Sequence, residues 1–183
     1  MNFYPAFLLV TAAEILFEAA ISARNSAVLK RSGAIDVAPG LLPIMAFLFA
    51  ALYLGSAFEY SHSKSVVQPA WAVAFSLVFL GAKLLKFWAI SALGRFWTMK
   101  VLILPGSRAV TGGPYRWIRH PNYVAVLMEI CSIAGAGKSL VTGLSVLLLF
   151  CVVLAFRIRA EEAALRKHTD YYEQMRDRPR FLP

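Results

Sequence analysis

Five long apolar segments constrain the fold of this chain more than any other feature. They cover about residues 3–22, 41–60, 69–92, 121–136 and 139–157 of the 183. A helix crosses the bilayer core of about 30 Å with roughly 20 apolar residues, and each segment reaches or approaches that length. Only 16% of the residues are charged, against about 25% in a typical soluble domain. We therefore predict an all-α integral membrane protein with about five transmembrane helices.

The loops between these segments differ in positive charge, and this difference predicts how the chain is oriented in the membrane. Lysine and arginine concentrate in three regions, at about 24–31, 95–119 and 157–180. Five spans bring all three regions to one side, so we expect the N-terminus outside and the C-terminus and active site in the cytoplasm. The net charge of +9 then fits anchoring at anionic membrane lipids, and we expect no nucleic-acid partner.

No internal repeat divides the chain, so we expect a single membrane domain over residues 1–183. Its first part, 1–93, contains three helices, and its second part, 94–183, contains a polar segment, two helices and a C-terminal helix. Gly135, Gly137 and Lys138 leave only a tight turn between the last two spans, which predicts an antiparallel hairpin. The good helix formers in 158–176 predict that the last span continues into a cytoplasmic helix, which Pro179 ends.

Polar residues concentrate in two clusters on the expected cytoplasmic side. The first ends in "GPYRWIRHPNY", residues 113–123, where Pro121 suits the first turn of a helix. The free amides of that turn would favour an anionic group, and Tyr115 and Tyr123 offer flat faces for stacking. In the second cluster Arg157 and Glu161 are four residues apart and share a helix face. Together the clusters could bind a small ligand with a ring, a carboxylate and a cation, such as S-adenosylmethionine, in a cytoplasmic cofactor pocket.

Each of these residues also has an ordinary structural explanation. Arg116 and Arg119 could be positive-inside anchors, while Trp117 and Tyr123 could belong to an interfacial aromatic belt. His120 could cap a helix, and Arg157 and Glu161 could form a solvated pair. The combination of the two clusters favours the functional interpretation.

That combination resembles a known family of membrane enzymes. Residues 113–123 match a G-x-Y-x-x-x-R-H-P-x-Y segment, and residues 157–165, "RIRAEEAAL", match R-x-x-x-E-E-x-x-L after a helical hairpin. Both motifs occur in the isoprenylcysteine carboxyl methyltransferase family, and the resemblance covers about residues 94–183. The first loop, "SARNSAVLKRSGAID", is similar to short bacterial members, which include enzymes that methylate alkylpyrone-type polyketide lipids.

The resemblance implies a cofactor, S-adenosylmethionine, and a role for particular residues. It implies that Arg157 orients the acceptor and acts with His120 in catalysis. The residues implied to bind the cofactor are Val110 (through its backbone), Tyr115, His120, Pro121, Asn122, Tyr123 and Glu161.

The acceptor is expected to be lipophilic, either prenylcysteine-like or an alkylpyrone or other polyketide lipid. A carboxylate acceptor is ionised at neutral pH and needs no general base, whereas a hydroxyl acceptor could use His120 or Glu161. Such an acceptor could enter sideways between helices, with Gly81 and the small residues of the last two spans allowing close helix packing. The sequence decides neither the acceptor nor the oligomeric state.

Five charged residues lie at membrane depth, where an unpaired charge costs about 2.5–3.5 kcal/mol. Lys83 is expected to extend to the interface, and Lys86 to do the same or to pair with Glu129 or reach the cofactor. Glu14 and Glu18 share a helix face and could line a tunnel or pair structurally.

Neither the cysteines nor the histidines have metal-ligand spacing. Cys131 and Cys151 lie in apolar segments and are expected to be buried. The three histidines are far apart in the sequence, so we expect no metal site.

Two other functions compete with methyl transfer. Membrane sterol reductases that use NADPH carry a similar R-H-P-N-Y segment, although the Arg157-x-x-x-Glu161-Glu162 element and the small size argue against one. A non-enzymatic accessory protein could also keep this fold.

Overall fold

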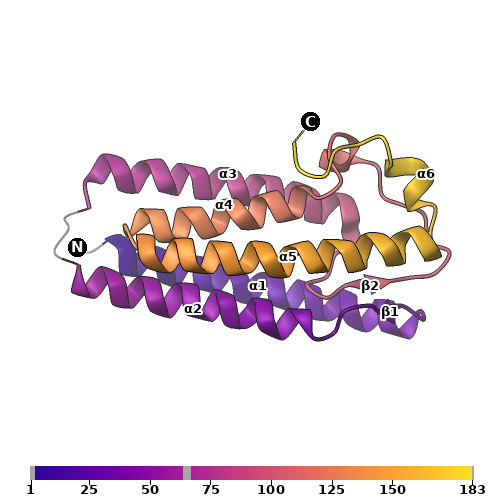
Figure 1. The fold of residues 1–183 in the computed structure, drawn as a ribbon, viewed down its shortest axis with the longest axis horizontal. Coiled ribbons are helices and arrows are strands. Elements are labelled where there is room, and N and C mark those ends of the chain that lie inside the picture. Colours follow the sequence, from indigo (N-terminus) through magenta and orange to yellow (C-terminus); the bar gives the residue numbers. More distant parts are fainter. Residues whose placement is uncertain (1–2, 64–66, 183) are drawn as a thin grey trace.

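The computed structural model describes residues 3–63 and 67–182, which form an elongated helical bundle (Figure 1). Its five long helices run up and down along one axis. They are α1 (Phe3–Arg31), α2 (Leu41–His62), α3 (Pro69–Leu93), α4 (Pro121–Ala136) and α5 (Leu140–His168). The shorter elements are β1 (Ile35–Asp36), η1 (Gly94–Phe96), β2 (Leu102–Ile103), η2 (Gly113–Arg116) and α6 (Tyr171–Met175).

These helices coincide with the five predicted segments, and α4 matches its prediction at both ends. Within the described residues, α1, α2, α3 and α5 are long and apolar enough to cross a membrane. They support a multi-pass membrane protein. Helix α4 has 16 residues and is therefore about 24 Å long, shorter than a bilayer core. A fifth transmembrane span remains a prediction.

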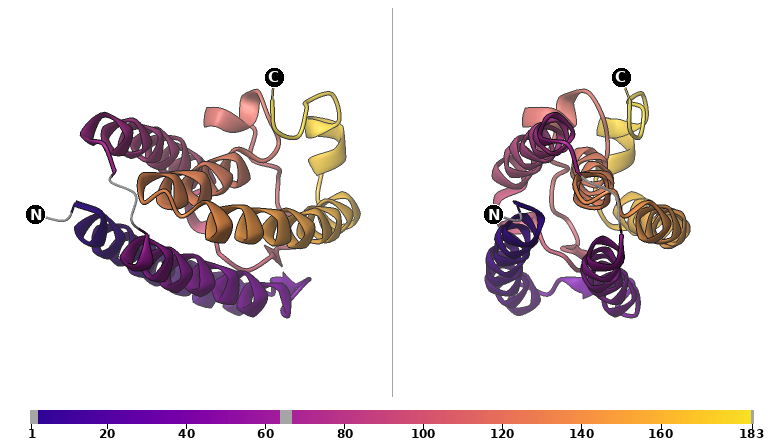
Figure 2. Two further views of the ribbon diagram at one scale, coloured as in Figure 1. Left: turned by 60° about the vertical axis from the view of Figure 1, so that its left-hand side comes forward. Right: turned by 90° about the vertical axis from the view of Figure 1, so that its left-hand side faces the viewer.

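Helix α4 lies between α3 and α5, as the end-on view of Figure 2 shows. Most of its residues are buried, including Ile130 and Ile133. It forms the predicted antiparallel hairpin with α5, and a Cβ at Gly143 would lie only 2.5 Å from the Cβ of Ala134. The expectation for Gly81 is wrong, because a Cβ there would meet nothing within 4 Å.

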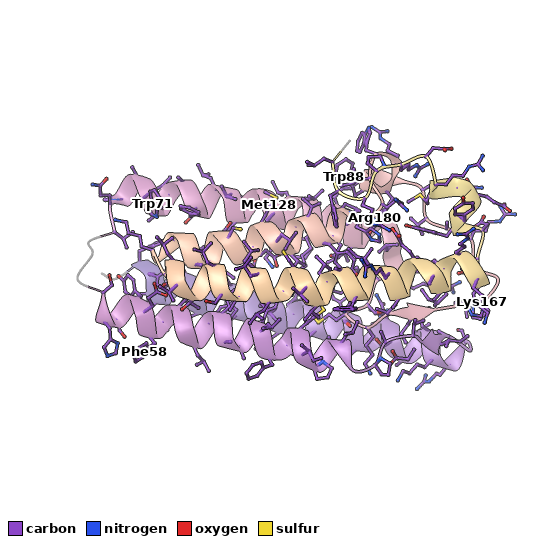
Figure 3. All side chains as sticks on the ribbon, in the orientation of Figure 1. Phe58, Trp71, Trp88, Met128, Lys167 and Arg180 are labelled. Atoms are coloured by element: carbon purple, nitrogen blue, oxygen red, sulfur yellow. The ribbon has the colours of Figure 1, made fainter. Side chains whose placement is uncertain are left out.

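One end of the bundle contains nearly all the non-helical chain, and we call it the motif end. It holds the segment from 94 to 120 and the C-terminal segment from 169 to 182 (Figure 1). The three basic regions meet at this end because the helices alternate in direction. Aromatic residues lie at both ends, Trp88 near the motif end and Phe58 and Trp71 near the other (Figure 3), as in membrane interface belts. The cytoplasmic orientation of the motif end remains a prediction.

Two local features at the motif end differ from expectation. A two-stranded antiparallel ladder pairs Ile35 with Ile103 and Asp36 with Leu102, where an all-α chain was expected. Helix α5 continues beyond residue 157 as predicted, but it ends at His168 and does not reach residue 176, because Thr169 adopts an extended conformation with φ −142° and ψ 176°. The chain then turns into the short helix α6.

Four charged side chains form a buried cluster between α1, α3 and α4, which we call the charge quartet. Lys83 Nζ lies 2.9 Å from Glu18 and 3.1 Å from Glu129. Lys86 Nζ lies 2.7 Å and 3.0 Å from the same two carboxylates. The pairing of Lys86 with Glu129 is therefore confirmed, and the expected extension of Lys83 to the interface is wrong. Glu14, partly exposed, lies 3.6 Å from Lys83.

The expected burial of the two cysteines is also wrong. Cys131 on α4 and Cys151 on α5 are both exposed on the outer surface. A lipid-facing surface is as apolar as a protein core, so an apolar sequence context does not separate the two.

Candidate functional site

The motif end contains a cavity of about 970 Å³, counted with its open mouth. We call it the polar cavity, because charged and hydroxyl side chains supply much of its wall. Its wall comes from the 94–120 segment, the start of α4, the end of α5, and α6.

The structure brings together most of the residues that the sequence singles out. Six predicted cofactor residues and Arg157 line the polar cavity: Val110, Tyr115, His120, Asn122, Tyr123, Glu161 and Arg157. Pro121 does not line it. This proline is fully buried and begins α4, so its contribution is to place its neighbours.

A hydrogen-bonded relay connects the two motifs. Arg157, which is 5% exposed, donates from Nε to the Tyr123 hydroxyl at 2.8 Å. That hydroxyl donates in turn to the Glu161 carboxylate. Tyr123 therefore lies between the arginine and the glutamate, which do not form the solvated pair considered above. A second Arg157 nitrogen, Nη2, donates to the Met99 carbonyl at 2.7 Å and ties the 94–120 segment to α5.

Glu162, next to Glu161, contacts three basic side chains. His120 Nε2 lies 2.9 Å from Oε1, and Arg119 Nη1 lies 3.1 Å from the same oxygen. Arg180 Nη2 lies 2.7 Å from Oε2. One carboxylate on α5 thus connects the residues before α4 with the C-terminal segment. His120 stands at the N-cap position of α4, but its side chain does not cap that helix.

The C-terminal segment folds back over the start of α4. The backbone amides of Arg119 and His120 donate to the carbonyls of Pro179 and Arg180 at 2.9 and 3.0 Å. Arg178 donates to the Tyr115 carbonyl. In Figure 3 Arg180 lies at the motif end beside these elements. The segment therefore acts as a strap that holds the Arg119-His120 backbone in place.

The backbone around Val110 is held by the junction between α5 and α6. The amide of Ala109 donates to Asp170 Oδ1 at 2.6 Å, and the amide of Gly106 donates to the His168 carbonyl at 2.8 Å. Gly113, at the start of η2, has φ +58°, and a Cβ there would lie 2.8 Å from the Ala92 Cβ. A larger residue would be strained and would also clash with α3.

The N-terminus of α4 is less open than the sequence suggests. The amides of Tyr123 and Val124 both donate to the His120 carbonyl, at 3.1 and 3.3 Å. Since Pro121 has no N–H, these two donors are not free to bind an anion in the way we expected.

Among the buried polar atoms without an ideal hydrogen bond in the described residues, two belong to residues of the polar cavity and lie close to each other. The Tyr171 hydroxyl and Arg119 Nε are both buried, and both residues line the polar cavity. Burial raises the pKa of Tyr171 well above its usual range, and Glu162 and Glu161 raise it further, although Arg119 opposes this. Burial also raises the pKa of Tyr115. Both phenols therefore stay protonated at neutral pH and can donate to a ligand.

A second cavity of about 720 Å³ lies deeper in the bundle, and we call it the apolar cavity. Its wall is mainly aliphatic and aromatic, with Leu42, Met45 and Phe49 from α2 and Phe150 from α5. It shares five wall residues with the polar cavity: Trp97, Thr98, Asn122, Tyr123 and Arg157. The two cavities therefore meet at the Arg157–Tyr123 hydrogen bond.

Several residues of this site escaped the sequence analysis. Glu162 stands beside Glu161 in the motif, but sequence spacing does not say which carboxylate faces the cavity. Tyr171 and Arg180 lie in a tail with no apolar periodicity, so only the tertiary fold brings them to α4. Trp97 donates from Nε1 to Asn122 Oδ1 at 3.3 Å, a contact between a loop and a helix that no local pattern predicts.

Comparisons with known proteins agree with the motifs. A model of the isoprenylcysteine carboxyl methyltransferase (ICMT) family matches residues 72–167. The chain is 32% identical over 153 residues to the uncharacterized protein YpbQ of Bacillus subtilis (strain 168), covering 83% of this chain and 90% of that protein. It is 25% identical over 164 residues to an uncharacterized protein of Haemophilus influenzae, covering 87% of this chain and 95% of the relative.

The strap predicts a measurable change in backbone protection when Glu162 is altered. Glu162→Gln removes the negative charge that holds Arg180 and Arg119, so the strap should open more often. A charge-assisted hydrogen bond contributes about 1.5–3 kcal/mol, so amide exchange at Arg119 and His120 should rise by about tenfold or more. Hydrogen–deuterium exchange in detergent measures this. Glu173→Gln, at an exposed carboxylate of α6, should leave both amides protected. Unchanged exchange in Glu162→Gln would mean that the strap holds by its backbone alone.

Proposed function

The chain belongs to the isoprenylcysteine carboxyl methyltransferase family, and on that premise we propose that it transfers a methyl group from S-adenosylmethionine to a lipophilic acceptor. The methylated atom is a carboxylate or hydroxyl oxygen of a prenylcysteine-like molecule or an alkylpyrone or other polyketide lipid. One observation carries the proposal: a polar and an apolar cavity meet at a shared wall. A water-soluble cofactor and a membrane-dissolved acceptor can thus reach the same point from opposite sides.

The residues of the polar cavity fit the chemistry of this cofactor. The cofactor carries an ammonium, a carboxylate, a ribose and an adenine ring. Glu161 supplies a carboxylate, Tyr171 supplies a buried O–H that has Arg119 beside it but no acceptor within the described residues, and Tyr115 offers an aromatic face. Buried polar groups are nearly always satisfied in native proteins, so a buried donor without an acceptor at a cavity suggests a polar ligand there.

The cofactor supplies a methyl group on a positively charged sulfur, which is a good leaving group. The protein then has little covalent chemistry to do and mainly aligns the acceptor oxygen with that methyl group, an effect worth at most about 7–11 kcal/mol. Arg157 is the residue that can orient the oxygen. Three of its five N–H donors bind Tyr123, Met99 and Met45, which leaves two for an acceptor carboxylate or oxyanion.

A hydroxyl acceptor would also have to lose a proton. The relay from Tyr123 to Glu161 offers one path, because the phenol already donates to the carboxylate. His120 offers another, since Nε2 is bonded to Glu162 and Nδ1 is the remaining ring nitrogen. A carboxylate acceptor would use neither.

Access and location follow from the same arrangement. We place the motif end in the cytoplasm, where the cofactor is made, because all three basic regions lie there. The acceptor would reach the apolar cavity from the membrane, where the walls come from α1, α2 and α4.

Cofactor binding is the first prediction to test. Calorimetry on the detergent-purified protein should show micromolar binding of S-adenosylhomocysteine and none of NADPH. His120→Ala and Glu161→Ala should abolish the signal, because both side chains line the polar cavity. His62→Ala and Glu173→Ala, which change exposed residues outside it, are the matched controls. Binding of NADPH instead, or of neither compound, would refute the methyltransferase assignment.

Tyr171 provides a finer test of the same cavity. Tyr171→Phe removes only the hydroxyl, so affinity for S-adenosylhomocysteine should fall by about 5–10-fold, the worth of one hydrogen bond of about 1 kcal/mol. Tyr172→Phe is the control, because its ring is 45% exposed and lies over the Arg166 guanidinium, outside the cavity. Equal affinities in the two variants would show that Tyr171 makes no contact with the cofactor.

A substitution of Arg157 should reduce methyl transfer much more than it reduces cofactor binding. Arg157→Gln should reduce methyl transfer by about 100-fold or more, the usual effect of losing a group aligned on the reacting oxygen, with a much smaller change in S-adenosylhomocysteine affinity. Transfer is measured as radiolabelled methyl from S-adenosylmethionine in a lipid extract of the source cells. Arg159→Gln, two residues along α5 and exposed, should keep full activity. Retained transfer in Arg157→Gln would remove this residue from the mechanism.

A further inference from the structure

The apolar cavity has one polar feature that methyl transfer does not use. Two members of the charge quartet, Glu18 and Lys86, form part of its wall beside apolar side chains such as Ile15 and Val126. We propose that Lys86 is a second polar contact for the acceptor, so that the acceptor carries a hydrogen-bond-accepting oxygen at a set distance from the oxygen that is methylated. This inference rests on the proposed function, because it concerns the acceptor of that same site.

The rise of the helices gives the distance between the two polar contacts of the acceptor, Arg157 and Lys86. Ser22 of α1 accepts a hydrogen bond from the amide of Met99, whose carbonyl accepts from Arg157, so Ser22 lies at the level of the reacting end. Glu18, the partner of Lys86, is four residues earlier, which corresponds to ~6 Å along the helix. On α4, Glu129 is six residues after Tyr123, which corresponds to ~9 Å. Lys86 therefore lies about 6–9 Å further into the bundle than Arg157.

Lys86 has a donor to offer at this position. Its ammonium group has three N–H donors, and the carboxylates of Glu18 and Glu129 account for two. The Lys86 side chain is only 6% exposed, so little water reaches the third N–H donor. A plain alkyl chain in the apolar cavity would cover Lys86 completely and leave that donor unpaired, whereas a carbonyl or hydroxyl oxygen at this depth would accept it.

Lys83 shows that a lysine can pair with these two carboxylates without lining the apolar cavity. It binds the same two carboxylates from one turn away on α3, at 2.9 and 3.1 Å, yet it does not line the apolar cavity. The two lysines thus share a structural role, and only Lys86 can touch an acceptor. The acceptor class that follows is an amphiphile with two polar groups in its head, separated by about 6–9 Å, and an apolar tail beyond the second.

Three fatty acids of equal length test the inference. They are hexadecanoic acid, 7-oxohexadecanoic acid, whose ketone lies at the required distance from the carboxylate, and 13-oxohexadecanoic acid, whose ketone lies too far along the chain. Binding of each is measured by calorimetry on the detergent-purified protein saturated with S-adenosylhomocysteine. The 7-oxo acid should bind at least about tenfold more tightly than either of the others.

Two double variants keep the buried charges balanced. Lys86→Met with Glu129→Gln leaves Lys83 paired with Glu18, and Lys83→Met with Glu129→Gln leaves Lys86 paired with Glu18. The preference for the 7-oxo acid should disappear in the first variant and persist in the second. A purely structural role for the quartet would affect both variants alike.

The outcomes separate this inference from the proposed function. If S-adenosylhomocysteine binds but the three acids bind equally, or none binds, the second contact is wrong while the cofactor site stands. A preference that survives in the Lys86 variant also overturns it. If S-adenosylhomocysteine itself does not bind, the proposed function fails and this inference falls with it.

Discussion

The charge quartet is the constraint on which the rest of the structure depends. Each of its members would cost about 2.5–3.5 kcal/mol alone at membrane depth, and lipid offers no alternative partner. Glu18, Lys83, Lys86 and Glu129 therefore satisfy one another only when α1, α3 and α4 stand in one register. Removing one member would leave an uncompensated buried charge, which typically destabilises a protein by about 3–5 kcal/mol. The quartet fixes the depth of α4, and the candidate site residues His120, Asn122 and Tyr123 lie at the start of that helix.

Besides the charge quartet, segments distant in the sequence also hold the start of α4 in place. Glu162 of α5 binds His120 and Arg119, and the strap binds the backbone of the same two residues. Arg157 binds both Tyr123 and the 94–120 segment. These contacts are charge-assisted or backbone hydrogen bonds at the water-facing end, where the hydrophobic effect contributes less. The depth of the site is thus set by buried ions and its shape by polar contacts, so changes to the strap should affect the cavity without unfolding the bundle.

The sequence predicts the helices well and their lateral contacts poorly, for a physical reason. Bilayer thickness dictates segment length, and Pro121 and Gly137 mark both ends of α4, so its bounds could be read directly. Apolar composition does not separate core from surface when the solvent is lipid, so Cys131 and Cys151 were misplaced. The motif residues Tyr115 to Tyr123 came together as expected because they are local. Whether Glu162 faces the cavity, by contrast, depends on how α5 is rotated about its axis. The strap is held by contacts between distant segments, which leave no periodic pattern in the sequence.

The polar cavity and the apolar cavity share a wall, so the environment changes from polar to apolar over the width of about one side chain. Tyr123 and Arg157 line both cavities, while Glu161, which accepts from the Tyr123 hydroxyl, lines only the polar one. A cofactor held by charges and an acceptor held by apolar surface need opposite environments, and a soluble enzyme would have to build the apolar one from its own core. In the proposed function, the acceptor would pass from the membrane into the apolar cavity that α2 and α5 help to build, and the start of α4 would bring the boundary between the two cavities to the acceptor. On the proposed function, this boundary would allow one site to hold two unlike molecules.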